Sequence, residues 1–140
     1  MVLLLLVAAG CSSPAPERVA QRLYERLDAA VRTGFDNEQE AIFSMLSEAS
    51  RQELETTAAR IRGAVGQPVL EPLQCLAVTG FDGRTGEFRP RRVAGGPDRV
   101  RLAIGSGASE RLLELVDEDG WKLDLEATFE LNREVATSVK

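Results

Sequence analysis

The sequence predicts an α+β domain in which N-terminal helices pack on one face of a curved antiparallel sheet. Three observations predict this class. Apolar residues recur at helical spacing in the first half, as at Val19, Leu23 and Leu27. Residues 99–104 alternate between apolar and other side chains, as in a half-buried strand, and the Asp119-Gly120 turn joins two further strand patterns. Helices followed by antiparallel strands define an α+β domain.

Terminal signals place three helices in the first half. Gly34 ends the first, because glycine just past a helix tolerates the left-handed conformation. Asp36, followed three positions later by Gln39, predicts a cap for the second. Ser50 with Glu53 is a capping-box pattern that opens the third. We expect these helices at about residues 18–33, 37–46 and 50–62.

Strands are expected in the second half, after Gly63, Gly66 and Pro68 break the helical pattern. They are predicted in the apolar run 69–78 and at about residues 99–104, 111–116 and 121–125, with a turn at 117–120. On the last strand one face carries Trp121, Leu123 and Leu125, and the other carries Lys122 and Asp124. The tail from Glu126 to Lys140 fits a strand extension, a short helix or a disordered end.

Composition narrows the class of protein. The 140 residues, with 44% hydrophobic and 28% charged side chains, fit one globular domain that needs no disulfide or metal to fold. The net charge is −5 and no dense Lys/Arg stripe occurs, so we expect no nucleic-acid partner. The absence of histidine excludes Ser-His-Asp triads and histidine metal sites. We expect no cofactor and no bound metal.

The amino terminus has the pattern of an export signal. Val2–Ala9 is wholly apolar, but eight residues span only about 12 Å as a helix, too short to cross a membrane. The run Leu6-Val7-Ala8-Ala9-Gly10-Cys11 resembles the lipobox of bacterial lipoproteins, although the usual basic residues before the apolar run are missing. The alternative is a buried strand or helix end.

That resemblance implies a signal peptide over residues 1–10 and a lipidated Cys11 followed by a tether to residue 16. It implies a bacterial envelope protein whose membrane contact is the lipid on Cys11. Ser12, in place of aspartate, favours the periplasmic face of the outer membrane over the inner membrane. Cys75 lies in an apolar run, which favours a small buried side chain over a reactive thiol or an intermolecular disulfide.

Two further stretches resemble a known family. Residues 43–54 (Phe-Ser-Met-Leu-Ser-Glu-Ala-Ser-Arg-Gln-Glu-Leu) and the closing hairpin from Leu113 to Leu125 are similar to stretches in small secreted proteins of the nuclear transport factor 2-like (cystatin-like) superfamily. The resemblance covers about residues 17–126 and leaves 127–140 as a C-terminal tail. It implies a cone, a bent sheet wrapped around helices, often with a pocket at its open end and often dimeric.

The family resemblance also suggests where chemistry would lie. Some enzymes with this fold place carboxylates and a tyrosine inside the cone, and here Tyr24, Asp28 and Asp124 are the candidates. Tyr24 at helical spacing equally fits a packing residue. Trp121 is either a stacking residue at a pocket or interface, or a core residue.

Charged and small residues give three weaker candidates. The arginine concentration, with Arg89, Arg91 and Arg92 at its centre, fits either contacts to an anionic surface or ordinary solvated positions. The acidic turn 117–119 lacks the ligand spacing of a Ca²⁺ site. Gly105-Ser106-Gly107 lacks the pattern of a nucleophile elbow.

We therefore expect a lipid-anchored envelope protein with a non-catalytic interaction or assembly domain, whose partner is a second copy or another envelope protein. The first alternative is a binder of a small apolar molecule in the cone. The second is an isomerase-like or hydrolase-like enzyme that uses Tyr24 and a carboxylate.

Overall fold

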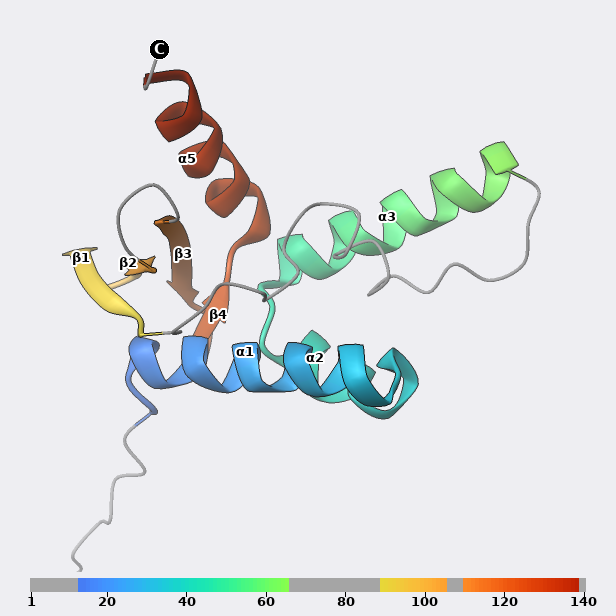
Figure 1. Ribbon diagram of the computed structural model, residues 1–140, viewed down its shortest axis with the longest axis horizontal. Coiled ribbons are helices and arrows are strands. Elements are labelled where there is room, and N and C mark those ends of the chain that lie inside the picture. The colour runs from blue at the N-terminus through green and yellow to red at the C-terminus, as the bar shows by residue number, and fades with distance from the viewer. Residues whose placement is uncertain (1–12, 66–88, 106–109, 139–140) are drawn as a thin grey trace, which may run out of the picture.

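The computed structural model describes residues 13–65, 89–105 and 110–138, and within them the protein is α+β, as predicted (Figure 1). Four features of the sequence lie outside these ranges: Cys11, Cys75, the predicted strand at 69–78, and Ser106-Gly107 of the Gly105-Ser106-Gly107 run. The elements are α1 (Pro16–Thr33), η1 (Phe35–Asn37), α2 (Gln39–Ser44), α3 (Glu48–Val65), β1 (Arg91–Gly95), β2 (Arg99–Ile104), β3 (Arg111–Asp117), β4 (Trp121–Leu123) and α5 (Leu125–Ser138).

Helix α1 confirms the first predicted helix. It begins with Pro16, whose fixed backbone angle suits the first helical position and whose missing N–H is not needed there. It stops at Gly34, which has φ +101° and whose N–H donates to the carbonyl of Ala30 at 2.8 Å. The face that carries Val19, Leu23 and Leu27 is buried.

The caps predicted for the next two helices are wrong. Asp36 lies inside the 3-10 turn η1, so it cannot cap α2, which begins at Gln39 without a side-chain cap. Helix α3 begins two residues earlier than predicted, because the Ser47 hydroxyl accepts the backbone N–H of Ser50 at 3.1 Å and is the cap. Gly63 does not end α3. An exposed helical glycine costs only about 1 kcal/mol, which the neighbouring turns tolerate.

The four described strands form one antiparallel sheet in the order β1-β2-β3-β4. Strands β2 and β3 confirm the prediction, and Val100 pairs with Leu115 while Leu102 pairs with Leu113. Their inward side chains are buried, as half-buried strands require. Strand β1 was not predicted, because Arg-Arg-Val-Ala-Gly has no apolar alternation and is exposed along its whole length.

The predicted hairpin between β3 and β4 is confirmed. Asp119 and Gly120 both have positive φ, +57° and +108°, and the Asp117 carboxylate accepts the Gly120 N–H at 3.0 Å. The last strand ends at Leu123, two residues before the predicted end. The chain turns at Asp124 and enters α5. Leu125 is therefore a buried residue of α5 and, contrary to the prediction, does not lie on the strand face that carries Leu123.

The C-terminal tail is helical from residue 125 to 138, one of its three predicted states, and α5 packs against β3. Strand β4 is too short to cover all of β3, and side chains of α5 fill the open edge. Asn132 accepts the Leu112 N–H and donates to the Leu112 carbonyl, both at 2.9 Å, and the Thr128 hydroxyl accepts the Glu114 N–H at 3.0 Å. A helix thus satisfies backbone groups that would otherwise attract another strand.

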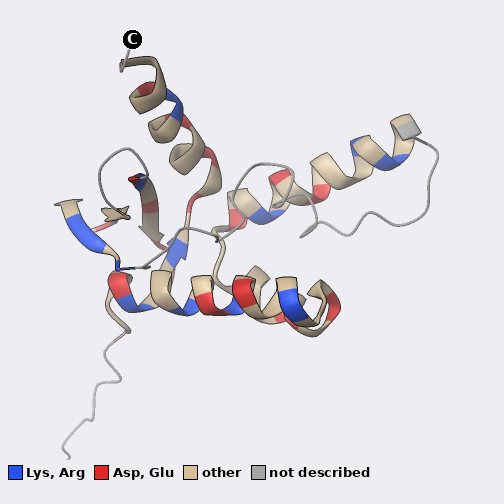
Figure 2. Ribbon diagram, viewed as in Figure 1, with Lys and Arg blue, Asp and Glu red and all other residues tan. Residues whose placement is uncertain are grey.

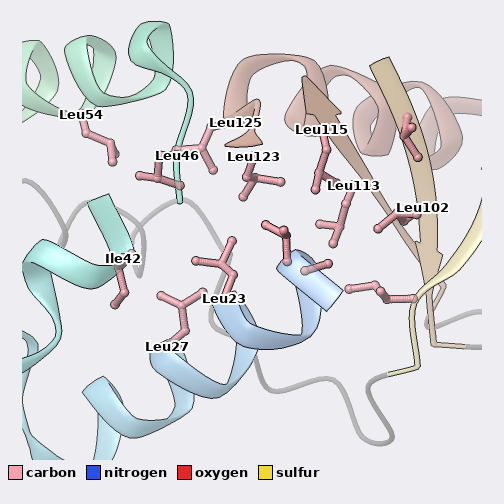
Figure 3. Packing of buried hydrophobic residues seen from close by; sticks show 14 of the residues in the cluster. Leu23, Leu27, Ile42, Leu46, Leu54, Leu102, Leu113, Leu115, Leu123 and Leu125 are labelled. Atoms are coloured by element: carbon pink, nitrogen blue, oxygen red, sulfur yellow. The ribbon is translucent and has the colours of Figure 1, made fainter. Parts of the chain in front are cut away.

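The core lies between α1 and the inner face of the sheet (Figure 3). Leu23 of α1 points toward Leu123 of β4, whereas Leu27 lies on the side of Ile42 of α2. Each of these four side chains is at most 3% exposed. The expectation that one sheet face packs on the helices is confirmed, and leucines dominate the buried cluster drawn in Figure 3.

Candidate functional surface

Tyr24 and the two carboxylates considered with it occupy different surroundings. Tyr24 is half-buried on α1. Asp28, one turn further on, is ion-paired with Arg32 on the same helix. Asp124 lies at the junction of β4 and α5, where its Oδ1 accepts the Ala127 N–H at 3.1 Å as the cap of α5. Both carboxylates of the enzyme hypothesis are therefore engaged in contacts that stabilise helices.

Trp121 opens β4, where it pairs with Asp117. The side chain is half-buried and packs against the hydrophobic core. This position fits the packing interpretation of Trp121.

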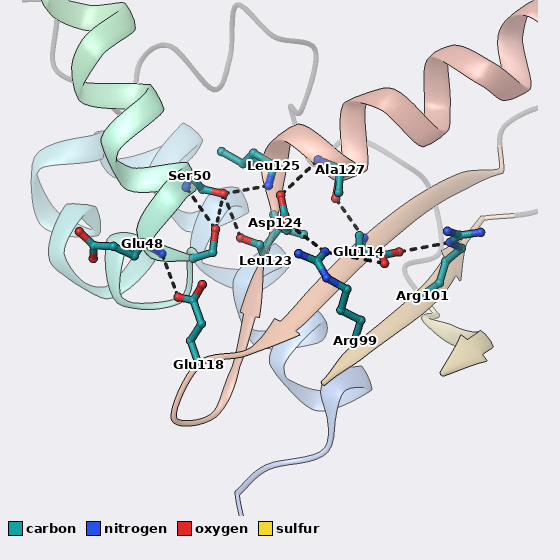
Figure 4. A network of polar contacts seen from close by, with 12 residues as sticks. Glu48, Ser50, Arg99, Arg101, Glu114, Glu118, Leu123, Asp124, Leu125 and Ala127 are labelled. Atoms are coloured by element: carbon teal, nitrogen blue, oxygen red, sulfur yellow. Dashed lines mark hydrogen bonds and ion pairs between the residues drawn. The ribbon is translucent and has the colours of Figure 1, made fainter. Parts of the chain in front are cut away.

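A ladder of ion pairs covers the outer face of the sheet (Figure 4). Arg101 on β2 pairs with Glu114 directly across on β3, with 3.2 Å between Nε and Oε2. Arg99 reaches Asp124 at 3.1 Å and Glu114 at 4.0 Å. Cross-strand pairs of this kind join residues far apart in sequence, so inspection of the arginine-rich segment alone could not identify their partners.

The arginines of β1 also have acidic partners. Arg92 holds Glu17 at the start of α1 through two hydrogen bonds, at 2.9 and 3.1 Å, and this guanidinium lowers the pKa of the Glu17 carboxyl. Arg91 pairs with Glu110 at 2.9 Å. Arg89 lies exposed just before the strand. The contact with Glu17 places Arg92 beside the first turn of α1, whereas Arg91, opposite Ala103 in the strand register, lies on the other face of the sheet.

Two buried serines form a polar junction that the sequence did not reveal (Figure 4). The hydroxyls of Ser47 and Ser50 are 2.7 Å apart. The Ser50 Oγ also accepts the Leu125 N–H at 2.9 Å and lies 3.3 Å from the Leu123 carbonyl, to which it donates. The junction joins the starts of α3 and α5 to the end of β4. The signals in the sequence were the position of both serines in the stretch 43–54 and the capping-box pattern at Ser50, and neither indicated the contacts with Leu123 and Leu125.

The acidic turn after β3 also has a structural role. The Glu118 carboxylate accepts the backbone N–H of Glu48 at 2.9 Å, which places a negative charge at the N-terminus of α3. Asp117 closes the turn itself. In the described ranges no group of three or more Cys, Asp or Glu side chains is arranged to hold a metal ion.

The comparisons with known proteins found no matching family model, no matching curated protein and no matching solved structure. Among the helices of the described ranges, none combines the length and the apolar character needed to cross a bilayer.

Proposed function

We propose that this chain is a lipid-anchored bacterial envelope protein whose domain serves protein interaction or assembly and not catalysis. The anchor rests on the lipobox-like run that ends at Cys11. Four residues lie between Cys11 and Pro16, where α1 begins, so the five Cα–Cα steps span at most about 17 Å. Lipid on Cys11 would hold the folded domain close to the membrane surface.

The solvent-inaccessible leucine cluster is the observation that carries the non-catalytic part of the proposal. The space between α1 and the inner sheet face holds leucines that are nearly inaccessible to solvent. The candidate carboxylates Asp28 and Asp124 are paired with arginines. An outer surface is therefore a better candidate for function than the centre of the described domain.

We further propose that the domain is a divergent nuclear transport factor 2-like cone. The order of helices followed by an antiparallel meander supports this, as does the packing of one sheet face on α1. Helix α5, which follows β4 directly, would be a local addition that protects the edge of β3.

Photo-crosslinking in the native envelope tests the interaction function. A photoreactive residue replaces each of the exposed valines Val31, Val93 and Val135 in the full-length protein. We expect a discrete crosslinked species from one of these positions, which is lost with Cys11→Ser and retained with the matched variant Cys75→Ser. Absence of crosslinks at all three positions, together with a reproducible small-molecule adduct in native mass spectra, would contradict the proposal and favour ligand binding.

A further inference from the structure

Basic side chains gather where the tether meets the domain. Arg92 of β1 contacts Glu17 in the first turn of α1, so the exposed strand β1 lies beside the point at which the chain enters the fold. Figure 2 shows basic ribbon segments on β1 and on the first turns of α1, near the acidic start of that helix. We call this region the tether-end surface. It consists of Arg18 and Arg22 on α1 and of Arg92 on β1, which holds Glu17.

The tether-end surface carries a net positive charge. Its three arginines face one acidic partner, Glu17, which leaves +2. Arg18 and Arg22 are exposed and make no ion pair with any described residue. These two charges are available to an external partner without the loss of an internal contact.

The other end of α1 has the opposite charge. Four acids, which are Asp28, Asp36, Glu38 and Glu40, stand there against Arg26 and Arg32, which leaves −2. The 18 residues of α1 separate the two ends by roughly 27 Å. The described domain is thus polarised along α1, with the positive end at the tether.

Tether length and charge together identify the partner. A lipidated Cys11 would keep the start of α1 within about 17 Å of its anchor. The potential of an anionic leaflet attracts arginines and falls off over a Debye length of about 8 Å at physiological salt. The tether therefore lets the positive end reach the zone where such a potential acts, and the same potential repels the acidic end of α1.

We propose that the tether-end surface rests on anionic phospholipid headgroups, so that β1 faces the membrane and the acidic end of α1 points away. This inference rests on the proposed lipid anchor at Cys11. On this proposal the lipid attaches the domain, and the charge distribution of the folded domain sets its orientation on the membrane. Helix α5 packs against β3, two strands away from β1 in the sheet. In this orientation α5 is exposed to envelope partners.

Three exposed valines permit a matched test of orientation. Val93 on β1, Val31 near the end of α1 and Val135 on α5 are 49%, 48% and 45% exposed. Each is replaced by cysteine in a Cys75→Ser background and spin-labelled in the full-length lipidated protein. The protein is reconstituted in vesicles that contain a small fraction of lipid with a paramagnetic metal chelate on its headgroup. The chelate speeds the spin relaxation of labels that lie close to the membrane surface.

In phosphatidylcholine vesicles with about a quarter phosphatidylglycerol, we expect relaxation of the Val93 label to exceed that of the other two by about three-fold or more. About 0.5 M salt or pure phosphatidylcholine should remove most of that excess, because both weaken the surface potential. Equal relaxation at the three positions in anionic vesicles would overturn the proposed orientation.

Charge variants test the arginines themselves. The double variant Arg18→Gln/Arg22→Gln should lower the excess relaxation of the Val93 label several-fold. The control Arg60→Gln/Arg62→Gln removes the same charge from the distal part of α3 and should leave that excess relaxation unchanged. An equal effect of the two pairs would overturn the role of the tether-end surface. The mass of the N-terminal peptide separates the two proposals: an unlipidated Cys11 defeats the anchor, whereas a lipidated Cys11 with equal label relaxation defeats only the orientation.

Discussion

At the scale of single residues, the Ser50 hydroxyl connects three elements through contacts that are closed to solvent. It bonds to Ser47 within the α2–α3 connection and to the backbone of Leu123 and Leu125. Buried polar groups are costly when unsatisfied, so the hydroxyl and its partners depend on one another.

We predict that Ser50→Ala lowers the free energy of unfolding by about 1–3 kcal/mol, because the Leu125 N–H loses its acceptor in a buried position. Ser44→Ala is the control, since its exposed hydroxyl bonds only within its own helix and its loss should change stability by about 0.5 kcal/mol or less. Urea denaturation measures both. Equal losses in the two variants would show that the junction has no special role.

The Glu17–Arg92 pair predicts a pH-dependent contribution to stability. The guanidinium of Arg92 lowers the pKa of Glu17 below its ordinary value of 4.5, so the ionised carboxylate favours the folded state. This stabilisation is complete above pH 4.5 and is lost as the pH falls through the lowered pKa. The pair is partly exposed and solvent-screened, so the contribution is about 0.2–1 kcal/mol.

We therefore expect Glu17→Gln to destabilise the protein at pH 7 and to destabilise it less near pH 3, because protonation of the Glu17 carboxyl weakens the pair as the pH falls. Urea midpoints of both proteins at the two pH values measure the difference. A loss that is the same size at both values would contradict the assignment of the pair.

At the scale of elements, α5 completes the sheet that β4 leaves short. Asn132 takes the place of a neighbouring strand by both accepting from and donating to the backbone of Leu112. The hydroxyl of Thr128, one turn earlier and buried, accepts the Glu114 N–H. The edge of β3 is thereby closed to intermolecular pairing.

Asn132→Ala should destabilise the protein by about 1–3 kcal/mol and speed hydrogen exchange at the Leu112 amide, because both backbone groups lose their partner. Asn37→Ala removes an exposed asparagine that bonds only to Thr33, and is the matched control. Unchanged exchange at Leu112 in Asn132→Ala would mean that α5 does not protect the strand.

Elements with a local signal were predictable, and those set by distant contacts were not. The β3–β4 hairpin was found because Asp119-Gly120 supplies the required backbone angles, and α1 because its apolar stripe is regular. The start of α5 was missed because Asp124 continues the alternation of a strand while acting as a helix cap. The alternation alone cannot distinguish these two roles.

At the scale of the whole molecule, the sequence identified the arginine-rich region but not its organisation. The partners of Arg92 and Arg101 lie 75 and 13 residues away, so only the folded chain brings the pairs together. The polarity along α1 likewise depends on β1 lying beside the first turn of α1. The pairing of Asp124 with Arg99, 25 residues away, likewise could not be inferred from residue type.

The anchor at Cys11 is the central claim, and the mass of the mature N-terminal peptide tests it most directly. The full-length protein and its Cys11→Ser and Cys75→Ser variants are expressed in a bacterium with lipoprotein processing, extracted from membranes and digested. We predict that the native protein and Cys75→Ser begin at Cys11 and carry the mass of a diacylglyceryl group, whereas Cys11→Ser keeps residues 1–10 and carries no lipid. An unmodified Cys11, or an intact N-terminus in the native protein, would contradict the account.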